Sequence, residues 1–142
     1  MEDFVNFKIS QKLKEKGFPQ SPDYFNYSSY YDWDGLRKIH SLSNASVWFD
    51  PNISRDNIYF APTISQVLKW LRDTHKLYVY PCIVSDYQDD FSPYVIYWSF
   101  TCDNIESGDS IYREYDRICE NRFDTYEDAA LAGIEYCLDN LI

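Results

Sequence analysis

The chain is 142 residues long and 45% of these are hydrophobic, which suits one globular domain that needs no metal or disulfide to hold its core. The 23 acidic and 13 basic residues leave a net charge of −10, which disfavours direct binding to nucleic-acid phosphates and docking on anionic membranes. The longest apolar runs, residues 77–84 and 94–100, are too short to span a bilayer, and the first residues lack the features of a signal peptide, so we expect a cytoplasmic protein.

Residues 1–60 are predicted to hold one helix followed by irregular strands. The helix covers residues 8–16, where Gly17 supplies the left-handed residue that ends it and Phe18 folds back onto it. Residues 23–60 are predicted to form short strands and loops, and their pattern leaves the boundaries open. The most strand-like pieces are residues 24–27, 47–49 and 58–60.

A capped amphipathic helix is predicted from Thr63 to His75 or Lys76. Thr63 is the expected N-cap, and Gln66 follows at the spacing of a capping box. At the other end, the helix dipole favours a positively charged imidazole on His75. One face carries a stripe with the spacing of a buried helix surface, made of Ile64, Val67, Leu68 and Leu71.

Three strands are predicted after this helix. The first covers residues 77–84, and Pro81 within it indicates an edge position or a bulge, because proline cannot donate to a neighbouring strand. The second covers residues 94–102 and is followed by a polar loop at 103–110. Residues 111–123 are a third strand candidate, whose mixed polar and apolar composition predicts one exposed face.

The last predicted element is a helix that begins after Thr125, its expected N-cap. Glu127 and Asp128 stand in its first turn, where the positive end of the helix favours acidic side chains. Gly133 interrupts the helix and predicts a close packing neighbour at that point. The buried stripe is expected to contain Ala130, Ile134, Cys137, Leu138 and Leu141.

From residue 63 the predicted order is therefore helix, strand, strand, strand, helix. Short connections favour antiparallel strands, and two helices can cover one face of such a sheet. We predict a two-layer α+β fold with an antiparallel sheet of three or more strands. Residues 1–142 are expected to form a single domain, in which 61–142 form the α-β-β-β-α unit and 1–60 extend it.

Catalytic motifs do not emerge from the sequence. It contains no Walker loop, dinucleotide-binding glycine pattern, nucleophile elbow or zincin motif. His40 and His75 are the only imidazoles, and nothing in the sequence places a cysteine beside either, so we assign no catalytic residue.

Metal and cofactor sites are also not expected. Residues 103–114 partly follow the pattern of a calcium loop, but Ile105 occupies a ligand position, so a polar hairpin loop is predicted instead. The cysteines form no C-x-x-C pair and are expected to be reduced thiols, with Cys137 in the core; they are Cys82, Cys102, Cys119 and Cys137.

Contact residues for a partner are predicted in two places. Trp70 lies one helical step off the buried stripe, where it either packs at the helix–sheet edge, which we favour, or is exposed together with Arg72. The second place is the acidic turn with Asp86, Asp89 and Asp90, together with Tyr94 at the start of the next predicted strand. We expect the side chains of this turn to be solvated unless a partner binds them. The predicted interaction surface consists of Trp70, Arg72, Asp86, Asp89, Asp90 and Tyr94.

Three segments share a further pattern. Residues 13–18 read Leu-Lys-x-x-Gly-Phe, residues 61–76 contain Ala-Pro-Thr and Trp-Leu-Arg, and residues 123–134 contain Thr-Tyr-Glu-x-Ala. In this order the segments resemble small uncharacterised proteins of gut Bacteroidales bacteria, their phages and mobile elements. The resemblance is loose over the first helix and good over residues 61–84 and 123–142. It implies a phage or mobile-element accessory protein, without an activity or site residues.

Three functions follow as hypotheses. The favoured one is a non-enzymatic protein-interaction module, a monomer or a homodimer, which requires an exposed apolar or aromatic patch. The alternative is an acidic nucleic-acid mimic that inhibits a host DNA-binding or defence protein, which requires carboxylates at phosphate spacing. A small hydrolase is the more distant alternative, and it requires a cleft that contains titratable groups with shifted pKa values.

Overall fold

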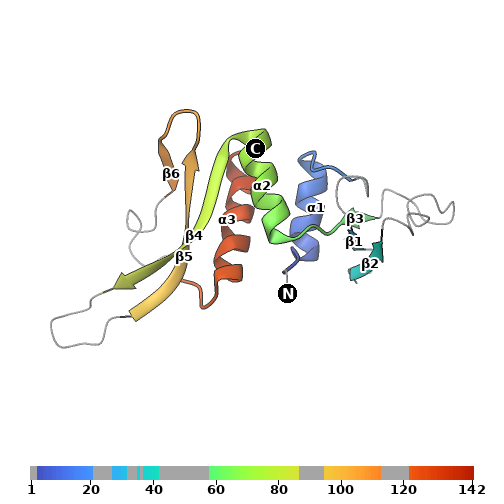
Figure 1. The fold of residues 1–142 in the computed structure, drawn as a ribbon, viewed down its shortest axis with the longest axis horizontal. Helices are drawn as coiled ribbons and strands as arrows, with labels where there is room; N and C mark the ends of the chain where they lie inside the picture. Colours follow the sequence, from blue (N-terminus) through green and yellow to red (C-terminus); the bar gives the residue numbers. More distant parts are fainter. Residues whose placement is uncertain are drawn as a thin grey trace. The chain divides into compact units, whose positions relative to one another are not determined.

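The computed structural model describes residues 3–20, 27–31, 35, 37–41, 58–86, 95–112 and 122–142. The chain divides into two compact units, Met1–Thr63 (unit 1) and Ile64–Ile142 (unit 2). Figure 1 shows their helices and strands. The expectation that residues 1–142 form a single domain stays a prediction, and each unit is described by itself.

Unit 1 contains one helix and a small antiparallel sheet. Helix α1 is Phe7–Glu15, and the sheet has the order β2-β1-β3. The predicted helix and the strand at residues 58–60 are confirmed, whereas residues 47–49 lie outside the described residues. The strands are β1 (Tyr27–Tyr31), β2 (Arg37–Ser41) and β3 (Tyr59–Phe60).

The end of α1 has the predicted glycine cap. Gly17 has a φ of +88°, a left-handed conformation that an L side chain rarely adopts. The backbone N–H of Phe18 donates to the carbonyl of Leu13 at 2.9 Å, and the N–H of Gly17 donates to the carbonyl of Lys14 at 3.2 Å. These two bonds define a Schellman motif. Phe18 is 2% exposed, which confirms that it folds back as the hydrophobic contact of the cap.

Unit 2 is a two-layer α+β fold, as predicted. All strands of its sheet are antiparallel, in the order β4-β5-β6. Helix α2 packs on β4, and α3 packs on β4, β5 and α2, so the two helices cover one face of the sheet (Figure 1). The elements are α2 (Ile64–His75), β4 (Leu77–Asp86), β5 (Val95–Asn104), β6 (Ser110–Tyr112) and α3 (Tyr126–Asn140).

The three strand predictions differ in outcome. Pro81 stands in β4, at the edge of the described sheet, where its missing N–H costs no ladder bond. The third predicted strand is described only at its ends, as β6 and as Phe123. Phe123 exchanges two backbone hydrogen bonds of 2.9 Å with Trp98 of β5. The described parts of residues 111–123 therefore lie beside β5, and residues 113–121 lie outside the described residues.

The core of unit 2 lies between the sheet and the two helices. Val79 of β4 and Cys102 of β5 are opposite each other in register and are both buried. Gly133 of α3 lies against this surface, because a Cβ atom there would stand 2.6 Å from Cγ1 of Val79 and 3.1 Å from Cγ of Phe100. The predicted close neighbour of Gly133 is thus confirmed. The fully buried face of α3 contains Ala129, Ala130, Ile134, Cys137 and Leu138.

The buried face of α2 is rotated from the predicted stripe toward Trp70, although Ile64 remains buried as predicted. Val67 and Leu71 are fully buried, as predicted, but Leu68 is only half-buried. Trp70 takes the remaining place in the core with 4% of its surface exposed. Its ring lies edge-on to His75, with 4.6 Å between the ring centroids. A large aromatic side chain gains more from burial than leucine, which is consistent with this rotation.

Candidate interaction surface

The acidic turn of the predicted interaction surface is mostly not described. Asp89, Asp90 and Tyr94 lie outside the described residues. Asp86 is described only as the last backbone position of β4. These positions remain predictions, and the described surface of unit 2 must be built from other residues.

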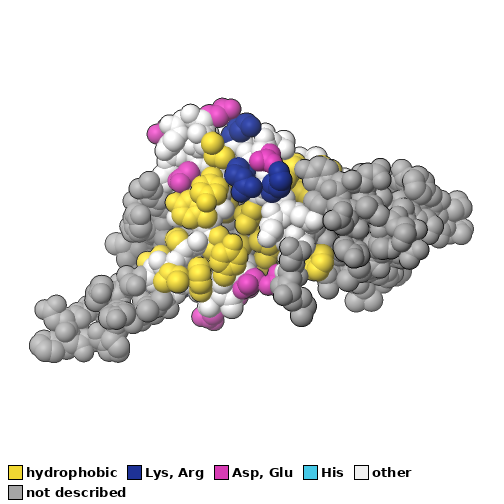
Figure 2. Space-filling model, in the orientation of Figure 1, with side chains coloured by type: hydrophobic (Ala, Val, Ile, Leu, Met, Phe, Trp, Pro, Cys, Tyr) yellow, Lys and Arg dark blue, Asp and Glu magenta, His cyan; other side chains and the backbone are white. Residues whose placement is uncertain are grey.

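Trp70 and Arg72 of the predicted interaction surface differ in exposure, since Trp70 is buried and Arg72 is exposed. The burial of Trp70 confirms that it packs inside the fold, so including it in the interaction surface was wrong. Arg72 is exposed at the C-terminal end of α2. Figure 2 shows basic side chains over α2, with apolar side chains over the neighbouring part of unit 2.

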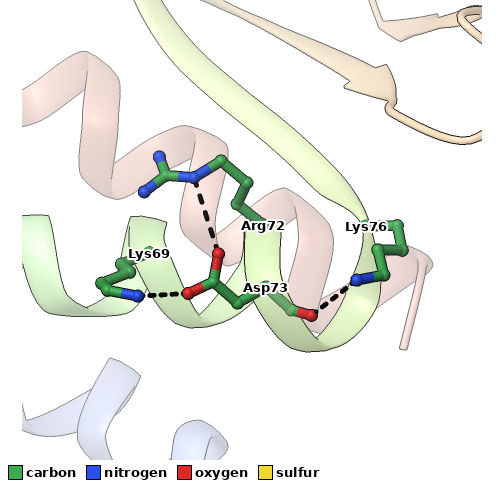
Figure 3. A network of polar contacts seen from close by, with 4 residues as sticks. All are labelled: Lys69, Arg72, Asp73 and Lys76. Atoms are coloured by element: carbon green, nitrogen blue, oxygen red, sulfur yellow. Dashed lines mark hydrogen bonds and ion pairs between the residues drawn. The ribbon is translucent and has the colours of Figure 1, made fainter.

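The basic side chains at the C-terminal end of α2 and just after it gather around Asp73 (Figure 3). Lys69 forms a hydrogen-bonded ion pair with the carboxylate of Asp73, and the Nε atom of Arg72 lies 3.8 Å from the other carboxylate oxygen. The Lys76 ammonium donates to the backbone carbonyl of Asp73 at 3.0 Å. The Lys69 hydrogen bond lowers the pKa of Asp73, and the three nearby cations add to this effect. Because these groups are exposed, the network contributes little stability. We interpret the basic side chains as cations that interact favourably with the negative end of the helix dipole.

His75 is the last residue of α2. Burial lowers its pKa, and its Nε2 atom has no hydrogen-bond partner. Burial disfavours the charged form of the imidazole, so this effect opposes the positive ring that the helix dipole favours. The chain reverses direction at Lys76, whose φ of 58° is left-handed. β4 then begins at Leu77.

A cluster of two tyrosines and one carboxylate lies just beyond this reversal, and we call it the tyrosine–carboxylate group. It consists of Tyr78, Tyr80 and Asp103. Tyr78 and Tyr80 are two positions apart on β4 and therefore point to the same face of the sheet, and Tyr78 is opposite Asp103 in register. The two ring centroids are 4.9 Å apart, and the planes are tilted by 33°.

The polar contacts of this group are incomplete. The Tyr80 hydroxyl donates to Oδ2 of Asp103 at 3.3 Å. Oδ1 of Asp103 is buried and has no hydrogen-bond partner. Burial raises the pKa of Tyr80, and the negative charge of Asp103 raises it further. The carboxylate thus lies against an aromatic surface, and one of its two oxygens has no hydrogen-bond partner.

Apolar side chains are exposed around Asp103. Tyr78 is 43% exposed, and Ile105 in the following turn is 46% exposed. Ile111 of β6 is 36% exposed and stands at the bulge opposite Cys102 and Asp103. The backbone N–H of Ile105 donates to the carbonyl of Lys76 at 2.9 Å, which ties the turn to the start of β4.

The loop at residues 104–109 is a hairpin turn, as predicted. The side-chain oxygen of Asn104 accepts the backbone N–H groups of Glu106 and Ser107 at 2.9 and 3.1 Å. The N–H of Asn104 donates to the carbonyl of Asp109 at 2.8 Å and closes the hairpin. Glu114, the last residue of the calcium-like pattern, lies outside the described residues. The turn positions Ile105 beside the tyrosine–carboxylate group.

The described cysteines lie on opposite sides of the sheet: Cys102 and Cys137 on the side of the helices, and Cys82 on the other. Cys102 and Cys137 are fully buried between β5 and α3, with 3.8 Å between their sulfur atoms. The neighbouring thiol and burial raise the pKa of Cys137, which disfavours a reactive thiolate. Cys82 lies on the other face, where its sulfur is 3.6 Å from the Thr101 hydroxyl. Cys137 is confirmed as a core residue, and Cys119 lies outside the described residues.

Sequence reasoning did not select the tyrosine–carboxylate group. The alternation of Tyr78 and Tyr80 in a predicted strand was a signal that the two rings share a face. The partner carboxylate is 23 residues from Tyr80, and only the register of β4 against β5 brings it there. No local pattern contains that register.

Comparison of the chain with protein-family models, curated proteins and solved structures finds no match. Within the described residues, none of the helices combines the length and the apolar character needed to cross a membrane. The geometry of the described surface is therefore the basis for the functional proposal.

Proposed function

We propose that this chain is a non-enzymatic protein-interaction module. One observation carries the proposal: Tyr78, Ile105 and Ile111, three of the five exposed large hydrophobic residues in the described part of the chain, lie around Asp103 at one end of the sheet. Exposed aromatic and aliphatic side chains that gather in one place are typical of binding surfaces.

The surface stands on rigid elements, which suits recognition. β4 and β5 pair over ten residues on each strand, and the Ile105 turn is held by backbone bonds to Lys76 and Asn104. A partner that contacts Tyr78 and Ile105 would not have to order a loose segment, so it would avoid part of the entropy cost of binding.

The proposal extends to an accessory role for a phage or mobile element, which is supported only by the sequence resemblance at residues 61–84 and 123–142. The charge of the chain suggests the alternative of an acidic nucleic-acid mimic. The described end of α2 does not favour that alternative, because Lys69, Arg72 and Lys76 are exposed there.

Affinity capture with the full chain tests the proposal. The Tyr78→Ser/Ile105→Ser double variant removes the two most exposed side chains of the surface. Tyr126→Ser is the matched control, because Tyr126 is also 43% exposed but lies on α3. We expect wild type and the control to recover the same stoichiometric partner and the double variant to lose it. Recovery of the same proteins by all three chains, each shown to be folded by circular dichroism, would contradict the proposal.

A further inference from the structure

The tyrosine–carboxylate group has an unmet electrostatic requirement. Oδ1 of Asp103 is buried without a hydrogen-bond partner, and no cation of the described residues forms an ion pair with this carboxylate. Buried polar atoms without partners are uncommon in folded proteins, and each needs a physical explanation such as an absent ion or ligand. A positive group is the charge that a carboxylate in this position requires.

The two aromatic rings add a second requirement of the same sign. Tyr78 and Tyr80 lie side by side, 4.9 Å between centroids, and Tyr78 is 43% exposed. The face of an aromatic ring carries a negative partial charge and attracts an ammonium or guanidinium group. The rings and the carboxylate therefore favour the same kind of ligand from one side of the sheet.

Among the described residues, the basic residue closest in sequence to Tyr78 makes its contact elsewhere. Lys76 precedes Tyr78 by two residues, but its ammonium donates to the carbonyl of Asp73 at the end of α2. Asp73 also holds Lys69 and lies near Arg72, so the cations of α2 are directed toward the helix (Figure 3). None of these three cations therefore supplies a positive ligand to the tyrosine–carboxylate group.

We propose that Tyr78, Tyr80 and Asp103 form a recognition site for a cationic side chain, a lysine ammonium or an arginine guanidinium, of a protein partner. The inference rests on the proposed interaction function and names the chemistry of its contact. The net charge of −10 supports it, because an acidic chain attracts basic partners over long range. The exposed Ile105 supplies the apolar contact that the aliphatic part of a lysine or arginine side chain would cover.

Titration of the isotope-labelled full chain with small probes tests this site by nuclear magnetic resonance. The probes are the N-acetyl methylamides of lysine, arginine and norleucine, the last having the four-carbon chain of lysine without its ammonium group. We expect saturable shifts of the amide signals of Tyr78, Tyr80 and Asp103 with the two cationic probes and none with norleucine. Absence of a saturable response to lysine and arginine, or an equal response to norleucine, would overturn the inference.

Variants separate the carboxylate from general charge. Asp103→Asn keeps the acceptor for Tyr80 and removes the charge, so we expect roughly tenfold weaker binding of both cationic probes. Asp109→Asn is the matched control, because Asp109 is an exposed carboxylate of the same hairpin, and it should bind as wild type does. Tyr78→Leu, which keeps an apolar side chain without a ring, should also weaken binding and gives a second test if Asp103→Asn is unfolded. Unchanged affinity in a folded Asp103→Asn or Tyr78→Leu variant would contradict the site.

The outcomes distinguish this inference from the proposed function. A partner that is captured through Tyr78 and Ile105, but without any response of the chain to the cationic probes, would overturn the cation site alone. A saturable cation response without any captured partner would support the site and count against the interaction module.

Discussion

Gly133 shows how one residue position adjusts a whole helix to its sheet. The position is inside α3, where glycine lowers helix stability, yet the backbone there lies so close to Val79 and Phe100 that a methyl group does not fit. The same closeness lets Ala130, Ile134 and Cys137 reach full burial on the strands. The cost of a helical glycine is therefore offset by packing across the interface.

Gly133→Ala is expected to destabilise the protein, although alanine favours a helix. The new Cβ would stand 2.6 Å from Cγ1 of Val79, and overpacking of this kind costs about 1–3 kcal/mol. Urea unfolding followed by circular dichroism measures the change in the free energy of unfolding. Ala132→Gly, one position away and only half-buried, should cost about 0.5–1 kcal/mol from propensity alone. A more stable Gly133→Ala variant would show that the gap at this position is wider than described.

His75 makes stability depend on pH at the residue scale. Burial lowers its folded-state pKa below 6.5, so the unfolded chain binds a proton more readily than the folded chain as pH falls below that value. The contribution of His75 to stability is thus present at neutral pH and is lost on acidification. We expect the urea midpoint of wild type to fall between about pH 7.5 and about pH 5.5 by more than that of His75→Gln, which retains His40. Equal falls in the two proteins would rule out this role of His75.

At the scale of elements, the start of α3 shows how a helix end is specified by a few neighbouring residues. Thr125 begins α3 with its side-chain oxygen accepting the N–H of Asp128 at 3.1 Å, as predicted. Glu127 and Asp128 stand in the first turn, at the positive end of the helix. The predicted cap of α2 by Thr63 stays a prediction for its side chain, although the helix does begin at the next residue, Ile64.

Loss of the α3 cap should weaken the element measurably. Thr125→Ala removes the acceptor for the Asp128 N–H and is expected to cost about 1 kcal/mol in the free energy of unfolding. Thr125→Ser keeps the oxygen and should restore most of that stability. Thermal or urea unfolding of the three proteins makes the comparison. If serine and alanine lower stability equally, the methyl group rather than the hydrogen bond is what matters at Thr125.

At the scale of the whole molecule, the two compact units raise the question of cooperativity. Each holds fewer than about 80 residues, a size at which one hydrophobic core supplies only a few kcal/mol. The units are also consecutive, since unit 1 ends at Thr63 and unit 2 begins at Ile64. The predicted single domain implies that they unfold together.

We expect one unfolding transition for the full chain. In a Trp33→Phe/Trp48→Phe variant, Trp70 and Trp98 of unit 2 are the remaining tryptophans, so fluorescence reports unit 2 alone. Far-UV circular dichroism reports the helices of both units. Coincident midpoints in urea would support a single domain, as two-state behaviour requires. Separate midpoints would instead assign each unit its own stability.

Local patterns were sufficient for the parts of this protein that depend on neighbouring residues. Gly17 and Phe18 predict the end of α1, Thr125 the start of α3, and Pro81 an edge position or a bulge, because caps and proline restrictions act within a few residues. The α+β class follows from the order of such elements. Residues 23–60 offered fewer of these signals, and β2 was not located from them.

Long-range packing accounts for the rest. The stripe on α2 predicted Leu68 as a core residue, but Trp70 is the more buried of the two and lies edge-on to the ring of His75. Helix periodicity alone does not fix which of the flanking positions completes a buried face. Tyr80 and Asp103 meet only because β4 and β5 pair in one register. Register depends on how all side chains of both strands pack against the helices, and a site built across strands therefore cannot be read from either strand alone.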